Sequence, residues 1–249
     1  MFIFFSSLFG FCLFDSFLTR LKLNGVYYFI HSIHNILIVI STFNDVINTF
    51  TNFKQLEIYD TNMIAVQLCF ALHFYHCIYY WRKFLFEDWL HHILMIGIAL
   101  PLGVYLPAST LLGFSLFFTT GLPGGIDYLL LFLVRNNWLR SIVEKKINYW
   151  LNVYIRSAGC CAHAAFVIAY TFNMYSNKSN EEMNYENMKF YASLVTACLT
   201  YWNGQYFMER VVSDYARKSL IIEQEKKKEN GNNEIEHQNI QTRKPVLIV

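Results

Sequence analysis

Residues Leu90–Val134 read LHHILMIGIALPLGVYLPASTLLGFSLFFTTGLPGGIDYLLLFLV, an apolar run in which Asp127 is the only Asp, Glu, Lys or Arg. A helix needs about 20 apolar residues to cross the hydrocarbon core of a bilayer, so this run is long enough for two crossings. The sequence YLPAS (Tyr105–Ser109) divides it. We therefore expect two membrane-spanning helices joined by a tight hairpin.

The same apolar pattern continues outward in both directions. Of the 249 residues, 55% are hydrophobic and 15% are charged, against about 25% charged in soluble domains. The abundant Phe, Tyr, Asn, Ile and Lys are typical of an AT-rich genome, such as that of a protist or a large DNA virus. We predict an all-α membrane protein, a bundle of about seven transmembrane helices, with six to eight possible. The expected spans are 2–18, 26–46, 62–81, 89–106, 109–134, 153–174 and 190–211.

The basic residues give these spans an orientation. Most of the 20 Lys and Arg residues fall in the first, third and fifth connections and in the C-terminal tail, whereas the other connections carry only Lys54, Lys178 and Lys189. The positive-inside rule then predicts a cytosolic C-terminus and a lumenal or outside N-terminus. The only N-x-[ST] sequon, at Asn177, falls on the predicted lumenal side, which makes it a weak candidate for glycosylation.

We expect three parts. Residues 1–19 form a retained transmembrane helix rather than a cleaved signal, because no basic stretch precedes the apolar one. Residues 20–215 form the main transmembrane domain, and 216–249 a flexible cytosolic tail without a core-forming pattern. The protein is expected in the endoplasmic reticulum or a host-cell membrane. The six cysteines all lie in apolar segments, which favours packing roles over disulfides.

Histidines are the main candidates for chemistry. Two pairs, His31 with His34 and His73 with His76, each share a helical face, and His91 and His92 open the fourth span. Ionisable groups at membrane depth are costly when charged and often mark a site. A di-iron centre like that of membrane desaturases is one interpretation, but the HxxH and HH spacings depart from the usual boxes. We expect no metal and no cofactor; the simpler alternative is that each histidine bonds a neighbouring group.

Other polar groups lie within or beside the predicted spans. Asp127 follows the GLPGG break and needs a partner if it is ionised. Arg156 is expected to pair with Asp127 or to extend toward the cytosol. Pro123 removes a helical hydrogen bond, and we interpret it as a kink rather than a binding loop. Asn203 and Glu209 lie near the end of the last span.

The order of these features resembles the TLC domain family, which includes the ceramide synthases and the translocation-associated membrane protein. The resemblance covers about residues 20–215. It rests on HSIHNILIVI with His34, LHFYHCIYYW with His76, DWLHHILMI with His91 and His92, TTGLPGGIDYLLLFL with Asp127, and LTYWNGQYFMERV with Asn203. Relatives commonly have Asp at position 76, and Glu and Ser at positions 119 and 121, where this chain has His76, Thr119 and Gly121.

The resemblance implies a multi-pass protein that binds or senses membrane lipids, or regulates their composition, without being a classical enzyme. The lipid-binding residues it implies are His34, His76, His91, His92, Asp127 and Asn203. If the protein is an enzyme, the resemblance implies an acyl-CoA-dependent N-acyltransferase with His91 and His92 as catalytic residues. Membrane lipids are the expected partners, and nucleic acid is not. The alternatives are the di-iron enzyme and a purely structural membrane protein.

Overall fold

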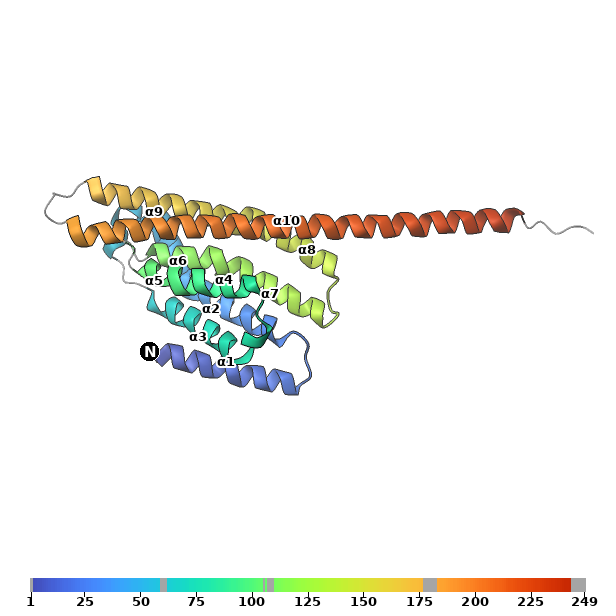
Figure 1. The fold of residues 1–249 in the computed structure, drawn as a ribbon, viewed down its shortest axis with the longest axis horizontal. Coiled ribbons are helices and arrows are strands. Elements are labelled where there is room, and N and C mark those ends of the chain that lie inside the picture. The colour runs from blue at the N-terminus through green and yellow to red at the C-terminus, as the bar shows by residue number, and fades with distance from the viewer. Residues whose placement is uncertain (1, 59–61, 105, 107–109, 177–182, 243–249) are drawn as a thin grey trace, which may run out of the picture.

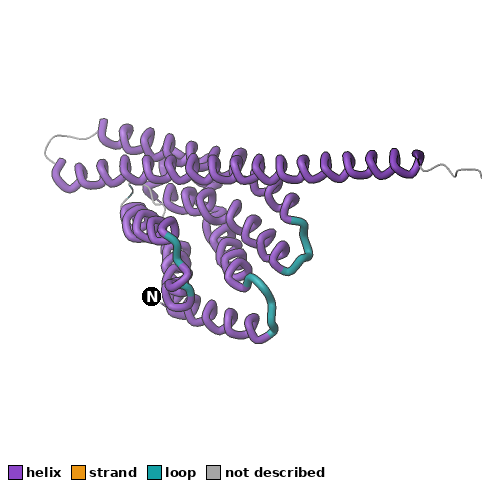
Figure 2. Tube along the Cα trace, turned by 45° about the vertical axis from the view of Figure 1, so that its right-hand side comes forward, coloured by secondary structure: helices purple, strands orange, loops and turns teal. Residues whose placement is uncertain are grey.

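The structure is a computed structural model that describes the chain except for residues 1, 59–61, 105, 107–109, 177–182 and 243–249 (Figure 1). Every regular element in the described ranges is helical (Figure 2), which confirms the predicted all-α bundle. The α-helices are α1 (Phe2–Arg20), α2 (Val26–Thr51), α3 (Met63–Tyr79), α4 (Phe86–His91), α5 (Leu100–Val104), α6 (Thr110–Leu116), α7 (Leu122–Arg135), α8 (Ser141–Trp150), α9 (Ala158–Ser176) and α10 (Met183–Thr242). Short 3₁₀ turns, η1 (Phe53–Ile58) and η2 (Trp81–Lys83), lie beside α3.

Three of the helical rods contain a π-helical stretch, where the backbone hydrogen bonds skip one residue more than in an α-helix. They are η3 (His92–Ala99) between α4 and α5, η4 (Phe117–Gly121) between α6 and α7, and η5 (Leu151–Ser157) between α8 and α9. Pro123 lies in the first turn of α7, directly after η4. Because proline cannot donate to the preceding turn, the hydrogen-bond register changes there, at the break predicted from GLPGG.

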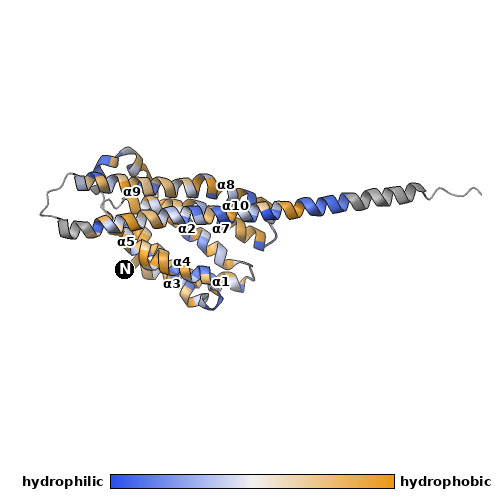
Figure 3. Cartoon of the chain, turned by 45° about the horizontal axis from the view of Figure 1, so that its top comes forward, coloured by the Kyte–Doolittle hydropathy of each residue, from blue (hydrophilic) through white to orange (hydrophobic). Residues whose placement is uncertain are grey.

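Four of the helices in the described ranges are long and apolar enough to cross a membrane. They are Phe2–Arg20, Val26–Thr51, Thr110–Arg135 and Ser141–Ser176. Large apolar side chains such as Ile40, which is 69% exposed, point outward from the bundle. Apolar residues therefore cover both the inside and the outside of the bundle (Figure 3), as expected for a protein surrounded by lipid.

One end of the bundle gathers basic residues, and we call it the basic end. Arg20 closes α1, Arg82 and Lys83 form part of η2, and Arg135 closes α7. Helix α10 leaves the bundle at the same end, to the right in Figure 1. The arrangement groups the connections that the sequence predicts on one side of the membrane.

Helix α1 is held against α3 by a buried acid. Tyr75 of α3 and Tyr80 beyond it both donate hydrogen bonds to the Asp15 carboxylate, and the Tyr80 bond is 2.6 Å long. Asp15 is 5% exposed, so these two hydroxyls provide partners for a carboxylate that burial would otherwise penalise. The first predicted span is therefore joined to the bundle by specific polar contacts as well as by apolar packing.

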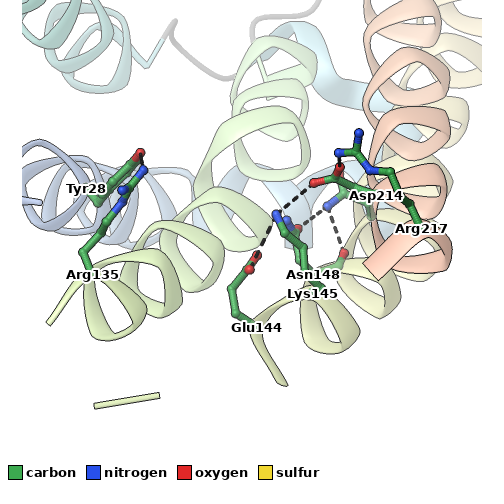
Figure 4. Close-up of polar contacts among 8 residues, drawn as sticks. Tyr28, Arg135, Glu144, Lys145, Asn148, Asp214 and Arg217 are labelled. Carbon is green, nitrogen blue, oxygen red and sulfur yellow. Dashed lines mark hydrogen bonds and ion pairs between the residues drawn. The ribbon is translucent and has the colours of Figure 1, made fainter. Parts of the chain in front are cut away.

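Helix α10 continues well past the bundle. It runs to Thr242, although the sequence from 216 onward predicts a flexible tail. The Nζ atom of Lys145 in α8 lies 3.1 Å from the Oδ2 atom of Asp214 in α10 and 3.6 Å from the Oε2 atom of Glu144. The guanidinium of Arg217 also pairs with Asp214 (Figure 4). Of these three pairs, Lys145–Asp214 connects α10 to α8 where the helix leaves the bundle, and the other two lie within one helix each. Beyond them its described side chains are mostly exposed and polar (Figure 3).

Candidate functional site

A cavity of about 260 Å³ lies inside the bundle. Its walls come from α2, α3, the rod α4–η3–α5, the rod α6–η4–α7, η5 and α10. The apolar part of the lining is formed by Leu72, Met95, Ile96, Ala99, Leu100, Leu112 and Leu116. The volume is close to the lower limit of about 300 Å³ for small-molecule pockets, so the cavity fits a small headgroup with part of one acyl chain rather than a whole two-chain lipid.

The polar part of the lining is dominated by five histidines: His31, His73, His76, His91 and His92. His76 lies three residues before α3 ends at the basic end, and His91 lies five residues after α4 begins there. Leu100 lies eight residues beyond His92 along the same rod, a rise of roughly 12 Å. The cavity is therefore polar toward the basic end and apolar farther into the bundle.

The histidine rings contact one another directly. The Nε2 atoms of His73 and His91 are 3.4 Å apart. His31 stacks on His76, with ring centroids 4.3 Å apart and an interplanar angle of 14°. The ring centroids of His73 and His92 are 5.0 Å apart. Three separate helical rods thus bring their histidines together into one cluster, which we call the histidine cluster.

Local hydrogen bonds fix the orientation of three of these rings. The Nδ1 atoms of His31, His73 and His92 each lie 2.7 Å from the carbonyl oxygen four residues earlier in the same helix. A carbonyl oxygen can only accept, so each Nδ1 carries the proton and donates it. In the neutral imidazole, Nε2 is then left with a lone pair, which in His73 lies within hydrogen-bonding distance of His91 Nε2. These three rings therefore offer acceptor or ligand atoms, not donors, at Nε2.

His76 is the least satisfied member of the cluster. It is 3% exposed, and neither of its ring nitrogens has a hydrogen-bond partner. The Nε2 atom of His92 is likewise buried without a partner. Unpaired buried polar atoms cost about 1–3 kcal/mol each and call for an explanation, such as a ligand, ion or water. His73, His76 and His92 form a group that could hold a metal ion, with ligand atoms all within 4.8 Å of one another.

Aromatic residues enclose one side of the cluster. The Tyr128 ring centroid of α7 lies 4.5 Å from that of His31, and the Tyr27 ring of α2 lies 5.1 Å from His76. Tyr27 and Tyr128 also line the cavity. These rings hold His31 and His76 between flat surfaces, which restricts their rotation and keeps the stacked pair in place.

A second polar wall faces the cluster from η5 and α10. Arg156, Asn203 and Arg210 line the cavity, and the Oδ1 atom of buried Asn203 has no hydrogen-bond partner. The guanidinium of Arg156 donates to Asn152 at 2.9 Å and lies 5.0 Å from the centroid of the Phe207 ring. The wall therefore offers a cation and an amide to a ligand in the cavity.

Each of the π-helical stretches found in the described ranges contributes to the lining. His92, Met95 and Ile96 come from η3, Thr119 and Thr120 from η4, and Arg156 from η5. The extra residue per turn rotates the side chains that follow and frees backbone groups, and such stretches often occur at functional sites. Their convergence on one cavity marks it as the specialised region of this bundle.

The cavity takes in part of the predicted site. His76, His91, His92 and Asn203 all line it. Two predicted lipid-binding residues, His34 and Asp127, lie outside the lining. His34 is fully buried beside Phe11 of α1, where its Nδ1 atom lies 2.9 Å from the Oδ1 atom of Asn35. The predicted glycosylation residue Asn177 lies outside the described residues.

Two histidines that the sequence did not assign to the lipid site belong to the cavity. His31 and His73 share faces with His34 and His76, but the spacing could not tell which member of each pair faces inward. The neighbouring residue Asn35 explains the position of His34. Asn35 turns toward η4, where it accepts a hydrogen bond from Thr120 at 3.0 Å.

Comparison of the chain with family models, curated proteins and solved structures gives no match.

Proposed function

We propose that this protein is a multi-pass membrane protein of about seven spans that binds a membrane lipid in the cavity, as the resemblance to TLC domain proteins implies. The headgroup would lie at the histidine cluster and an acyl chain against the apolar lining. The observation that carries the proposal is the polarity of the cavity, with histidines toward the basic end and Leu100, Leu112 and Leu116 farther in. Under the positive-inside rule, the basic end faces the cytosol.

The charges of the lining specify the headgroup. Arg156 and Arg210 are cationic, and the neutral imidazoles of His31, His73 and His92 accept hydrogen bonds at Nε2. A headgroup with both an anionic oxygen and a hydroxyl or amine donor satisfies both sets of groups. We therefore propose a ligand with one acyl chain in the cavity and a small headgroup that carries both an acceptor and a donor.

The test is to identify the lipids that remain bound to the purified protein. Ala99→Phe adds bulk to the apolar lining, and we expect it to lower the amount of co-purifying lipid severalfold. Ile98→Phe is the matched control, because Ile98 lies next in the same stretch but is 39% exposed and absent from the lining. Equal lipid content in wild type and both variants, by quantitative mass spectrometry, would rule out the proposed cavity as the binding site.

Acyl transfer is a second candidate, because a polar wall does face His91 and His92. An imidazole at this position could remove a proton from an attacking amine or hydroxyl. The carboxylates of Glu87 and Asp88 lie at the exposed edge of the same cavity. An enzyme built in this way would need the proton-accepting nitrogen of His91 or His92 close to the nucleophile.

The two candidates predict different outcomes for cellular lipids. If the protein transfers acyl groups, cells that express it gain one N- or O-acylated lipid class, and the His91→Ala, His92→Ala double variant abolishes the gain. If the protein only binds lipid, no product class accumulates in cells with either form. Lipidomics of the two cell lines, matched for expression level, separates the candidates.

A further inference from the structure

Three histidines of the cavity bring their ring nitrogens closer together than hydrogen bonding to a lipid headgroup requires. They are His73, His76 and His92. Each offers one nitrogen, and the three atoms lie within 4.8 Å of one another. Two histidines come from α3 and the third from η3, so the group forms only when the two rods pack together. We propose that these three histidines bind one divalent transition-metal ion, which for the test is Zn²⁺.

The tautomers of His73 and His92 suit a metal. In each ring Nδ1 donates to a backbone carbonyl at 2.7 Å, which leaves the Nε2 lone pair toward the cluster. Metal-binding histidines almost always have this arrangement, with the non-ligating N–H held by a carbonyl or carboxylate. Helical backbone therefore provides the outer hydrogen bonds for two of the three ligands.

The unpaired ring nitrogens of His76 support a metal site independently of the tautomers of His73 and His92. It is 3% exposed, lies among other histidines, and has no hydrogen-bond partner at either nitrogen. A neutral imidazole left in this state loses hydrogen bonds at both nitrogens, whereas a metal ion would take one lone pair directly. The Nε2 atom of His92 is buried without a partner as well, and it lies in the same group.

The separations are compatible with coordination. Zn–N bonds of 2.0–2.1 Å in a tetrahedral site place nitrogen ligands about 3.3 Å apart. The 4.8 Å limit exceeds that edge by about 1.5 Å, and because the Nδ1 hydrogen bonds hold the rings of His73 and His92, a small shift of η3 toward α3 would close it when the ion binds. The Nε2 atoms of His73 and His91 are already 3.4 Å apart. That contact would give way when His73 binds the ion, and three histidine ligands leave the fourth position of a tetrahedral site for another ligand.

The ligand set also selects the class of metal. Three imidazole nitrogens favour Zn²⁺, Cu²⁺, Ni²⁺ or Fe²⁺ over Mg²⁺ and Ca²⁺, which require oxygen ligands. Three histidines with one open position are typical of a catalytic zinc site, in which a water molecule or a substrate oxygen takes the fourth place. A lipid headgroup oxygen could occupy that place, so the metal site goes beyond lipid binding without depending on it. With the ion bound, the Nε2 lone pairs of His73 and His92 no longer accept from the headgroup, and His31 is the acceptor that remains among these three.

The experiment measures metal in the protein, purified in detergent through a tag that contains no histidine. After incubation with Zn²⁺ and removal of the excess, we expect about one equivalent per wild-type chain. His73→Gln, His76→Gln and His92→Gln should each weaken binding at least tenfold. His163→Gln is the matched control, because His163 is as buried as His76, also has ring nitrogens without a hydrogen-bond partner, and lies outside the cavity. It should retain the metal.

Two results with Zn²⁺ would overturn the proposal, and a third comes from Co²⁺. One is wild-type protein that holds no more Zn²⁺ than the His73→Gln, His76→Gln double variant. The other is a loss of metal in His163→Gln as large as in the cluster variants. Co²⁺ provides a measurement that does not depend on how the variants fold: folded wild-type protein should develop visible d–d absorption, and its absence contradicts the site. No lipid is added, so failure here leaves the proposed lipid binding untouched.

Discussion

At the scale of single residues, the candidate site could be predicted only in part. The HxxH spacings correctly place His73 with His76 on one side of a helix, and the HH pair marks the entry to the next rod. Spacing cannot give the rotation of a helix within the bundle, and that rotation places His31 in the cavity and His34 against Phe11. The tautomers set by backbone carbonyls also depend on the folded helix rather than on residue order.

Asn62 gives a residue-scale prediction about stability. Its side chain accepts from the backbone N–H of Ala65 at the start of α3, and it donates to Ser41 O at 2.6 Å and Asp45 Oδ2 at 2.8 Å. Loss of a helix cap costs about 1 kcal/mol, and loss of a hydrogen bond to a buried acid adds about as much. We expect Asn62→Ala to lower the free energy of unfolding by about 2 kcal/mol.

Thermal or denaturant unfolding in detergent would measure this effect. Asn44→Ala is the control, because Asn44 is exposed on α2, and it should change stability by less than about 0.5 kcal/mol. An equal effect of the two substitutions would show that the Asn62 hydrogen bonds do not join α2 to α3.

At the scale of elements, most of the fold follows from the sequence. Apolar segments gave helices in the predicted order, and GLPGG gave the break before α7. The sequence predicts a kink at Pro123 but not the π-helical hydrogen bonding of η4. Pro101 follows η3 at the same spacing as Pro123 follows η4, whereas η5 has no proline at that position. The length of α10 was also not predicted, since its charged, Asn-rich residues have no apolar face and the helix is not held by packing there.

Glycines control how closely α2 and α6 approach. A Cβ atom on Gly113 would lie 1.8 Å from Asp45 Oδ2 and 2.4 Å from its Cγ, which no side-chain adjustment of a few tenths of an ångström relieves. We expect Gly113→Ala to destabilise the bundle by about 1–3 kcal/mol, as overpacking does. The unfolding midpoint in detergent is the measurement.

Gly10 of α1 is the matched control for this prediction. A Cβ atom there would meet nothing within 4 Å, and alanine has the higher helix propensity by about 1 kcal/mol. Gly10→Ala should therefore leave stability unchanged or raise it. If Gly113→Ala were equally well tolerated, α2 and α6 would not pack as closely as described.

The ion pairs between α8 and α10 give a prediction about pH. Burial alone would raise the pKa of Asp214, but the hydrogen bonds from Lys145 and Arg217 outweigh it and leave the pKa below its ordinary value of 3.8. The pKa of Asp214 is lower in the folded protein than in the unfolded chain. The contact of Asp214 with Lys145 and Arg217 therefore stabilises the folded protein fully at pH values above the unfolded-state pKa. That contribution is lost as pH falls through the folded pKa.

Asp214→Asn should cost about 0.5 kcal/mol at neutral pH, a small value because the side chain is 38% exposed. The difference from wild type should shrink as pH falls below about 4. Glu223→Gln, which removes the exposed pair with Lys227, is the control and should not affect the bundle. A cost for Asp214→Asn that stays constant down to the acid limit would contradict this account of the pair.

At the scale of the whole molecule, the basic end and the projecting α10 define an orientation that can be tested. If the basic end is cytosolic, Asn177 is lumenal, and the protein made in the presence of endoplasmic-reticulum membranes should carry one glycan. Asn177→Gln should remove the glycosidase-sensitive shift. Asn232→Ser creates a sequon at Asn230 in the tail. A glycan at Asn230 instead of Asn177 would invert the orientation.

The central claim is that a lipid enters the cavity with its headgroup at the histidine cluster. Photo-crosslinking with a lipid that carries a diazirine near the end of its acyl chain tests this claim most directly. We predict crosslinks mapped by mass spectrometry to Ala99, Leu100 and Leu112, which line the apolar part of the cavity, and their loss in Ala99→Phe. Crosslinks confined to outward residues such as Ile40 and Phe172, unchanged by that substitution, would contradict it.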